Sequence, residues 1–176
     1  LMYRAMPSWY VNVTVLKERM VELNREINWY PDAVGTKRFN NWLQNARDWN
    51  ISRDRFWGAP IPIWRNVDDP KDIIIIGSKS ELAFFSNQPV PDDLHRQYVD
   101  TIEIVRDGKT YKRIPQVFDC WFESGSMPYA QVGYRPHQAT DEEKEVFEKT
   151  HFPADFIAEG LDQTRGWFYT LLILST

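Results

Sequence analysis

Phe156-Ile-Ala-Glu-Gly-Leu-Asp-Gln-Thr-Arg-Gly-Trp-Phe168 is the stretch of sequence that decides the fold. Residues 154–159 are mostly apolar and predict a strand, which ends at the glycine that follows. Residues 162–175 predict a helix, because apolar side chains dominate them without a proline. Strand, glycine turn and helix make half of a βαβ unit, so we expect an α/β fold.

Polar residues gather where this strand is predicted to end and the helix to begin. In open α/β sheets, ligands bind outside the carboxyl ends of the strands. Asp162 would there accept hydrogen bonds from two ribose hydroxyls, and Gly160 would let a ligand approach the backbone. The alternative is an ordinary helix start, with Asp162 near the helix dipole and Gly160 as a turn. The spacing alone favours the ordinary helix start.

A second informative segment is Phe118-Asp-Cys-Trp-Phe-Glu-Ser-Gly-Ser-Met-Pro-Tyr-Ala130. Its start predicts a strand at 118–122, followed by a loop of small residues. Trp121 is then either the indole wall of a pocket or a core residue, and the pattern alone favours the core residue. Cys120 falls among bulky apolar neighbours in the predicted strand, so we expect an inert thiol.

The third segment is Trp49-Asn-Ile-Ser-Arg-Asp-Arg-Phe-Trp-Gly-Ala-Pro-Ile-Pro-Ile-Trp64. Arg53 and Arg55 stand beside aromatic residues, a combination that contacts nucleic-acid strands by phosphate pairing and stacking. They would equally serve as ion-pair partners of Asp48 and Asp54, and the sequence leaves both interpretations open. Two prolines near the end of the segment predict a rigid, extended backbone.

The rest of the chain predicts three regions: 1–64, a small α+β insert at 65–115, and 116–176. Apolar periodicity and turn signals place the remaining elements. They are helices at 15–27 and 36–48, strands at 9–14 and 72–76, helices that start at the Ser78 and Thr140 capping-box patterns, and a hairpin of 101–105 with 110–114 around Asp107-Gly108.

Composition excludes several classes of function. A net charge of −4 argues against a main nucleic-acid-binding module, which is usually basic. One cysteine permits no intrachain disulfide, and His95, His137 and His151 lack metal-ligand spacing. No apolar run is long enough to predict a membrane span. The apolar stretch 171–176 has no helix stop signal, so we expect a piece of a longer protein.

Together the three segments resemble the class I aminoacyl-tRNA synthetases for branched aliphatic amino acids. Residues 49–64 are similar to the block that follows the editing insertion in this family. Residues 119–130 resemble the isoleucyl branch in its eukaryotic cytosolic form, whereas the valyl branch usually has Thr and Ser in place of Cys120 and Glu123. Residues 152–168 resemble the adenylate-binding strand and helix. The resemblance implies the second half of a Rossmann-like catalytic domain with a small α+β connective insert.

The resemblance also implies roles for individual residues. Trp121 and Trp167 would wall the isoleucine side-chain pocket, and Arg53 and Arg55 are candidate tRNA contacts. No residue is assigned as a general acid or base, because positioning and electrostatics dominate this chemistry. The residues expected to bind the adenylate are Glu159, Gly160, Asp162 and Gln163.

The family also implies substrates, a compartment and missing parts. A cytoplasmic parent enzyme would use isoleucine, ATP with Mg²⁺, and tRNA(Ile). The His-Ile-Gly-His-type and Lys-Met-Ser-Lys-Ser motifs of its other parts do not occur in this chain. This chain would therefore need the first half of the catalytic domain as a partner, and without cysteine pairs in the insert we expect no zinc. The alternatives are a valyl- or leucyl-type synthetase and a non-catalytic interaction module derived from a synthetase.

Overall fold

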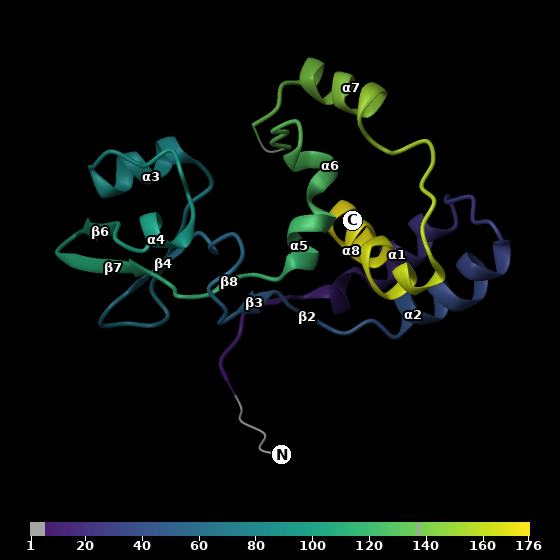
Figure 1. Ribbon diagram of the computed structural model, residues 1–176, viewed down its shortest axis with the longest axis horizontal. Coiled ribbons are helices and arrows are strands. Elements are labelled where there is room, and N and C mark those ends of the chain that lie inside the picture. Colours follow the sequence, from purple (N-terminus) through teal and green to yellow (C-terminus); the bar gives the residue numbers. More distant parts are fainter. Residues whose placement is uncertain (1–5, 137) are drawn as a thin grey trace. The chain divides into compact units, whose positions relative to one another are not determined.

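The computed structural model describes residues 6–136 and 138–176 and divides the chain into two compact units (Figure 1). Unit 1 comprises residues 1–9 and 50–119, and unit 2 comprises 10–49 and 120–176. The chain is thus a mixed α/β structure in which each unit is built from segments that are distant in sequence. Within the described ranges, no helix is both long and apolar enough to cross a membrane.

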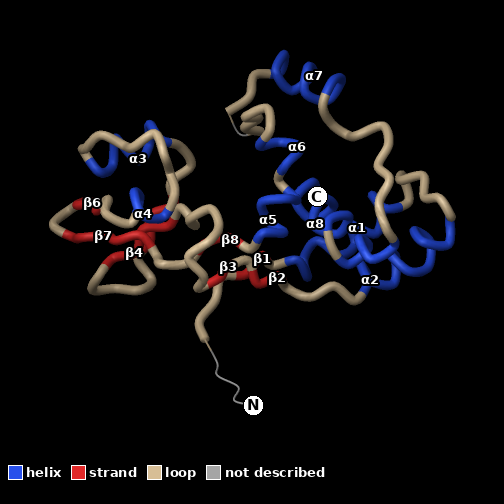
Figure 2. The backbone as a smooth tube through the Cα atoms, viewed as in Figure 1, coloured by secondary structure: helices blue, strands red, loops and turns tan. Residues whose placement is uncertain are grey.

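Unit 1 is built on an antiparallel sheet of four strands in the order β5-β4-β7-β6 (Figure 2). Its tight turn between β6 and β7 confirms the predicted hairpin, because Asp107 and Gly108 have φ angles of 53° and 74°. Such positive φ values at both central residues are what a type I′ turn requires. The strands are β4 (Ile63–Asn66), β5 (Ile73–Ile75), β6 (Glu103–Arg106) and β7 (Lys109–Arg113).

One face of this sheet buries Trp64 in an apolar cluster with residues of the unit's helices. The indole nitrogen of Trp64 donates a 2.7 Å hydrogen bond to the Ile102 carbonyl, so its one polar atom is satisfied inside the core. Helix α3 (Lys79–Ser86) begins as predicted after Ser78, whose hydroxyl accepts from the Glu81 amide. Helix α4 (Arg96–Val99) completes this part of the unit.

Polar side chains of unit 1 are bound to one another. A single oxygen of Asp72, Oδ2, accepts from the side chains of Asn66, Lys109 and Tyr111 at 2.8 to 3.0 Å. The hydrogen bond from Lys109, with those from Asn66 and Tyr111, lowers the pKa of Asp72 to about 2. These bonds fix the Asp72 carboxylate within unit 1.

A short two-stranded sheet completes unit 1. In it, β3 (Ser52–Arg53) pairs with β8 (Val117–Phe118) in antiparallel register. The segment between β3 and β4 carries the two prolines, and Pro60 makes one isolated bridge to Val117. The rigid, extended connection predicted between β3 and β4 is an irregular segment. It bridges back to β8, the strand that pairs with β3.

Unit 2 is mainly helical. Helices η1, α1, η2 and α2 come from its first segment and the others from its second (Figure 1). A short pair of strands, β1 (Tyr10–Val11) and β2 (Trp49–Asn50), accompanies them. The helices are η1 (Val13–Leu16), α1 (Lys17–Asn24), the π-helix η2 (Val34–Phe39), α2 (Asn40–Gln44), α5 (Cys120–Gly125), α6 (Met127–Ala130), α7 (Asp141–Thr150), the 3-10 helix η3 (Leu161–Arg165) and α8 (Trp167–Ser175).

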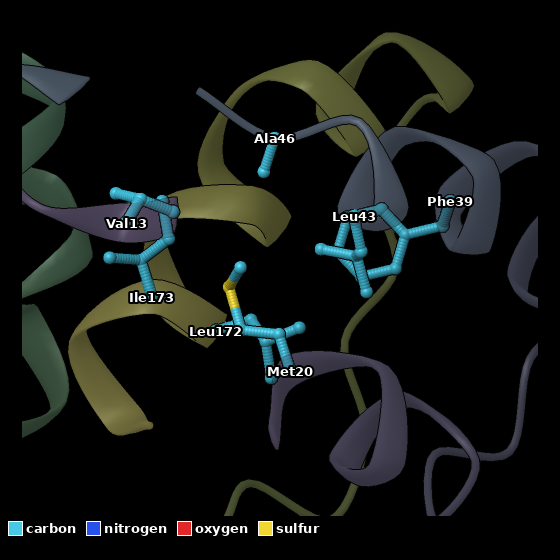
Figure 3. Close-up of a cluster of buried hydrophobic side chains, with 7 residues drawn as sticks. All are labelled: Val13, Met20, Phe39, Leu43, Ala46, Leu172 and Ile173. Atoms are coloured by element: carbon cyan, nitrogen blue, oxygen red, sulfur yellow. The ribbon is translucent and has the colours of Figure 1, made fainter. Parts of the chain in front are cut away.

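The core of unit 2 joins its two sequence segments. Figure 3 shows Leu172 and Ile173 of α8 among apolar side chains of the first segment. Gly35 lies directly against the Trp29 ring, where a Cβ would stand 1.9 Å from Trp29 Cδ1. The remaining buried members of the cluster are Val13, Met20, Phe39, Leu43 and Ala46.

Two predicted strands are wrong. Residues 154–159 form no strand, because no strand among the described residues pairs with them, and the Phe156 side chain stays 84% exposed. The strand predicted at 118–122 ends at Phe118, and the apolar run continues as α5, which packs on α8. Short apolar runs fit a buried helix as well as a strand, so periodicity could not separate the two.

Other predicted elements are confirmed with different bounds. The first predicted helix begins as η1 and ends at Asn24, and the strand before it keeps only Tyr10 and Val11. The second predicted helix divides into η2 and α2. Thr140 and Glu143 form the complete capping box at the start of α7, as its sequence pattern indicates.

Candidate functional site

The stretch that resembles an adenylate-binding motif lies in unit 2, in η3 and the start of α8. Gly160 precedes η3 with extended backbone angles. A Cβ at this position would stand 2.4 Å from Asp162 Oδ1, so only glycine leaves room for the carboxylate as it lies. The glycine is explained by this close approach, without a positive φ.

A chain of hydrogen bonds fixes the Asp162 carboxylate. Its Oδ2 accepts a 2.9 Å bond from the Gln163 side-chain nitrogen, and the Gln163 side-chain oxygen accepts from the Trp167 amide at 2.9 Å. Gln163 thus connects the acid to the first turn of α8. Asp162 is exposed, and most of its acceptor capacity is directed to solvent or to a ligand.

Two indole rings lie close to this chain of bonds. Trp167 Nε1 donates a 3.0 Å bond to the Ser124 carbonyl, which ties α8 to α5. Trp121 comes from α5, and a Cβ at Gly166 would stand 3.2 Å from its Cη2. Trp121 is 41% exposed and Trp167 is half-buried, so each ring keeps some exposed apolar surface.

Six of the predicted site residues lie in unit 2. Four of them form one hydrogen-bonded or packed group: Asp162, Gln163, Trp121 and Trp167. Gly160, the fifth, lies beside Asp162. Glu159 differs, because it is exposed and makes no hydrogen bond or ion pair with any residue in the described ranges. A carboxylate and two indoles on neighbouring elements are the kinds of group that bind hydroxyls and aliphatic surface, respectively.

The arginines considered for nucleic-acid contact lie in unit 1 and differ from each other. Arg53 pairs with the buried Asp119 carboxylate at 3.0 Å, and its Nη1 also donates to the Asn50 and Ser52 carbonyls. Arg55 is exposed. Arg53 does form an ion pair, as one of the two interpretations expected. Its partner, however, is Asp119 and not Asp48 or Asp54.

Cys120 is exposed on α5, so its placement in a strand and among apolar neighbours was wrong. Across the described ranges, no group of three His, Cys, Asp or Glu side chains is arranged to hold a metal ion. His137 lies outside the described residues. Cavities of about 320 and 510 Å³ occur elsewhere, beside β4 and beside α7 respectively.

Sequence reasoning missed residues that shape this site. Gly166 has no Cβ and so leaves room for the Trp121 ring. A Cβ there would also stand 2.7 Å from the Gln163 side-chain oxygen. A glycine at a helix start was the available signal. Ser124 contributes only its carbonyl, and the Arg38 bond to Thr164 links residues 126 positions apart, so neither leaves a local sequence signal.

Comparison with known proteins identifies the class. The family model described as tRNA synthetases class I (I, L, M and V) matches residues 2–176. This chain belongs to that family of class I aminoacyl-tRNA synthetases.

Within the family, the chain is similar to isoleucine–tRNA ligases. It is 52% identical over 175 residues to the one from Protochlamydia amoebophila and 54% identical over 177 residues to the one from Treponema denticola, in each case over 99% of this chain. It is 47% identical over 190 residues to the probable cytoplasmic isoleucine–tRNA ligase of Enterocytozoon bieneusi. The chain spans 15 to 20% of the length of these relatives.

Proposed function

We propose that this chain is part of an isoleucine–tRNA ligase and supplies one side of the site for isoleucyl-adenylate. The parent enzyme would activate isoleucine with ATP and then transfer it to tRNA(Ile). The observation that carries the proposal is the group of Asp162, Gln163, Trp121 and Trp167, joined by bonds of 2.9 to 3.0 Å and by close packing at Gly166.

Each residue of this group has a role that its chemistry supports. Asp162 accepts hydrogen bonds from the two ribose hydroxyls of the adenylate, while Gln163 holds the carboxylate in place. Trp121 and Trp167 provide rigid apolar surfaces for the branched side chain at little entropic cost. Glu159 and Gly160 border the ligand before η3. The group binds and orients the intermediate, and no proton transfer is assigned to it.

We assign no phosphate chemistry to this chain, because the His-Ile-Gly-His-type and Lys-Met-Ser-Lys-Ser motifs do not occur in it. ATP enters the parent enzyme as its Mg²⁺ complex, and Mg²⁺ prefers clustered oxygen ligands and phosphates. Among the described residues, no group of three His, Cys, Asp or Glu side chains is arranged to hold a metal ion, and we assign no step to Mg²⁺ in this chain. We likewise propose that the insert functions without zinc.

We further propose that residues 116–176 are the second half of a Rossmann-like catalytic domain, 1–64 the return from the editing domain, and 65–115 a connective insert. Phe156, Ile157 and Leu161 support this proposal, because all three are large, apolar and exposed.

The finer assignments concern tRNA and the cellular setting. Arg55 is the better candidate for tRNA contact, since Arg53 is already bound to Asp119. Asp119, Cys120 and Glu123 around Trp121 resemble the eukaryotic cytosolic form, which supports a cytoplasmic location. One relative is named cytoplasmic, and the other relatives compared are bacterial.

Isothermal titration of the full chain with a non-hydrolysable isoleucyl-adenylate analogue tests this function. We expect weak binding that is lost in Trp167→Ala and about tenfold weaker in Asp162→Asn, because charged hydrogen bonds contribute about 1.5–3 kcal/mol. Trp57→Ala is the matched control, since Trp57 is an exposed tryptophan of unit 1.

The same titration separates the alternatives. Equal or tighter binding of a valyl or leucyl analogue would replace the isoleucyl assignment with another branch of the family. Absence of binding to every analogue, in a chain shown by circular dichroism to be folded, would favour the non-catalytic module.

A further inference from the structure

We propose that Arg38 is a positioning residue that holds η3 so that Asp162 and Gln163 face the adenylate. This inference rests on the proposed function and deepens it. Arg38 contributes no atom to the ligand-facing group described above. It acts through Thr164, which follows Gln163 directly.

The carrying observation is a hydrogen bond between distant parts of unit 2. Arg38 Nε donates to Thr164 Oγ1 at 3.1 Å across 126 residues of sequence. The Thr164 hydroxyl donates its own proton to the Leu161 carbonyl at 2.8 Å. Thr164 is fully buried, so both halves of its hydroxyl are used and the turn of η3 is fixed from inside.

A second contact holds the next residue of η3 from the same side. The Arg165 guanidinium lies 4.5 Å from the centroid of the Trp42 ring, a cation–π geometry. Trp42 belongs to α2, which continues directly from the helix that carries Arg38. The segment from Val34 to Gln44 therefore contacts two consecutive residues between Gln163 and Gly166.

The site needs this support because η3 is too short to set its own direction. It is a five-residue 3-10 helix, and such helices have poor hydrogen-bond geometry and little stability alone. Its orientation must come from tertiary contacts. Arg38 is well placed for this role, since its neighbour Phe39 is buried in the core of unit 2 and anchors the backbone.

The π-helical form of η2 is consistent with this role. π-helical turns are rare and are frequent at functional sites. Here the π-helix spans residues 34–39 and includes Arg38. The local backbone is thus unusual at the residue that reaches the site motif.

The test compares Arg38→Met and Thr164→Val with the unchanged full chain by amide hydrogen exchange. We expect exchange at the Gln163 and Gly166 amides, which close the turn of η3, to rise by about tenfold in both variants. Amides of α1 keep their protection. Arg19→Met is the matched control, because Arg19 makes only an exposed ion pair with Glu22 on α1.

Affinity for the isoleucyl-adenylate analogue is the second measurement. We expect Arg38→Met and Thr164→Val each to weaken binding by about tenfold, and the double variant to bind no more weakly than either one. Thr164→Ser keeps the hydroxyl and should restore both readouts. If Arg38→Met does not fold, Arg38→Lys replaces it, since lysine keeps the charge and stem but lacks the guanidinium.

The two readouts separate this proposal from the function on which it rests. If the unchanged chain binds no analogue, the proposed function fails, and the exchange data still decide whether Arg38 orders η3. Unchanged exchange at Gln163 and Gly166 in Arg38→Met would overturn the positioning role. Faster exchange with unchanged affinity would overturn its connection to the ligand.

Discussion

Trp64 in the sheet of unit 1 and the apolar residues just before η3 in unit 2 differ sharply in their exposure to solvent. Unit 1 buries Trp64 and satisfies its indole nitrogen with the Ile102 carbonyl. The segment before η3 in unit 2 leaves Phe156 and Ile157 exposed. Exposed apolar side chains such as these are available for contact with a ligand or with another part of the protein.

Two aspartates, Asp72 and Asp162, differ in how many hydrogen bonds they accept. Asp72 of unit 1 accepts three side-chain hydrogen bonds on one oxygen, which lowers its pKa to about 2. Asp162 of unit 2 accepts one side-chain bond, from Gln163. The fold of unit 1 uses the Asp72 carboxylate, whereas Asp162 has acceptor capacity beyond its bond to Gln163.

The largest predicted effect on stability concerns the buried Trp64 and the exposed Phe156. Trp64→Ala should destabilise unit 1 by about 3–5 kcal/mol, because it removes a buried ring and leaves a cavity. Phe156→Ala should change stability by less than about 0.5 kcal/mol, because its side chain is exposed. Urea unfolding followed by circular dichroism measures both, and equal losses would contradict the distinction.

A smaller effect is expected where α5 and α8 approach each other in unit 2. A Cβ at Gly125 would stand 3.0 Å from Thr170 Cβ and 3.1 Å from the Thr170 backbone carbon. Gly125→Ala should therefore cost about 1–3 kcal/mol and move Trp121 away from Trp167. Denaturant unfolding checks the stability, and loss of analogue binding checks the site. Unchanged values of both would show that the two helices are not packed as described.

Arg53 and Arg55 of unit 1 are expected to differ in their contributions to stability and to tRNA binding. Arg53→Met should cost about 1–2 kcal/mol, because it removes the charged partner of the buried Asp119. Arg55→Met should leave stability within about 0.5 kcal/mol and reduce binding of tRNA to the parent enzyme. Thermal unfolding and filter binding are the measurements. A destabilised Arg55→Met that binds tRNA normally would reverse their roles.

The smallest effect concerns acid. The folded pKa of Asp72 lies below its ordinary value of 3.8, so its stabilising contribution is complete above pH 3.8 and is lost as pH falls toward about 2. Unit 1 should lose stability over this range, and Asp72→Asn should lose less because it has no carboxylate to protonate. Urea midpoints from pH 6 to pH 2.5 test this. Parallel curves for the two proteins would remove Asp72 as the cause.

Local signals in the sequence predicted local structure well. The Asp107-Gly108 turn and the Thr140 capping box depend on residues within four positions, and the structure has both. The strand at 154–159 needed a neighbouring strand that the described residues do not supply, so its pattern alone was misleading. Pairing between distant strands is a property of the fold and not of a short window.

Some contacts of the candidate site were predictable from a short motif, whereas others depend on the packing of remote segments. Asp162, Gln163 and Trp167 follow one another on a short motif, so their proximity was predictable, and the resemblance added Trp121. The helix that carries Trp121 and the bond from Arg38 to Thr164 arise from packing between remote segments. No local pattern encodes contacts of that kind.

The most direct test of the account follows the indole signals of the full chain, labelled with ¹⁵N at tryptophan, during addition of the isoleucyl-adenylate analogue. We expect the signals of Trp121 and Trp167, assigned with the two single Trp→Phe variants, to shift together with one affinity, while the signal of Trp64 in unit 1 does not move. Shifts confined to Trp64, or to only one of the two site rings, would contradict a shared adenylate site.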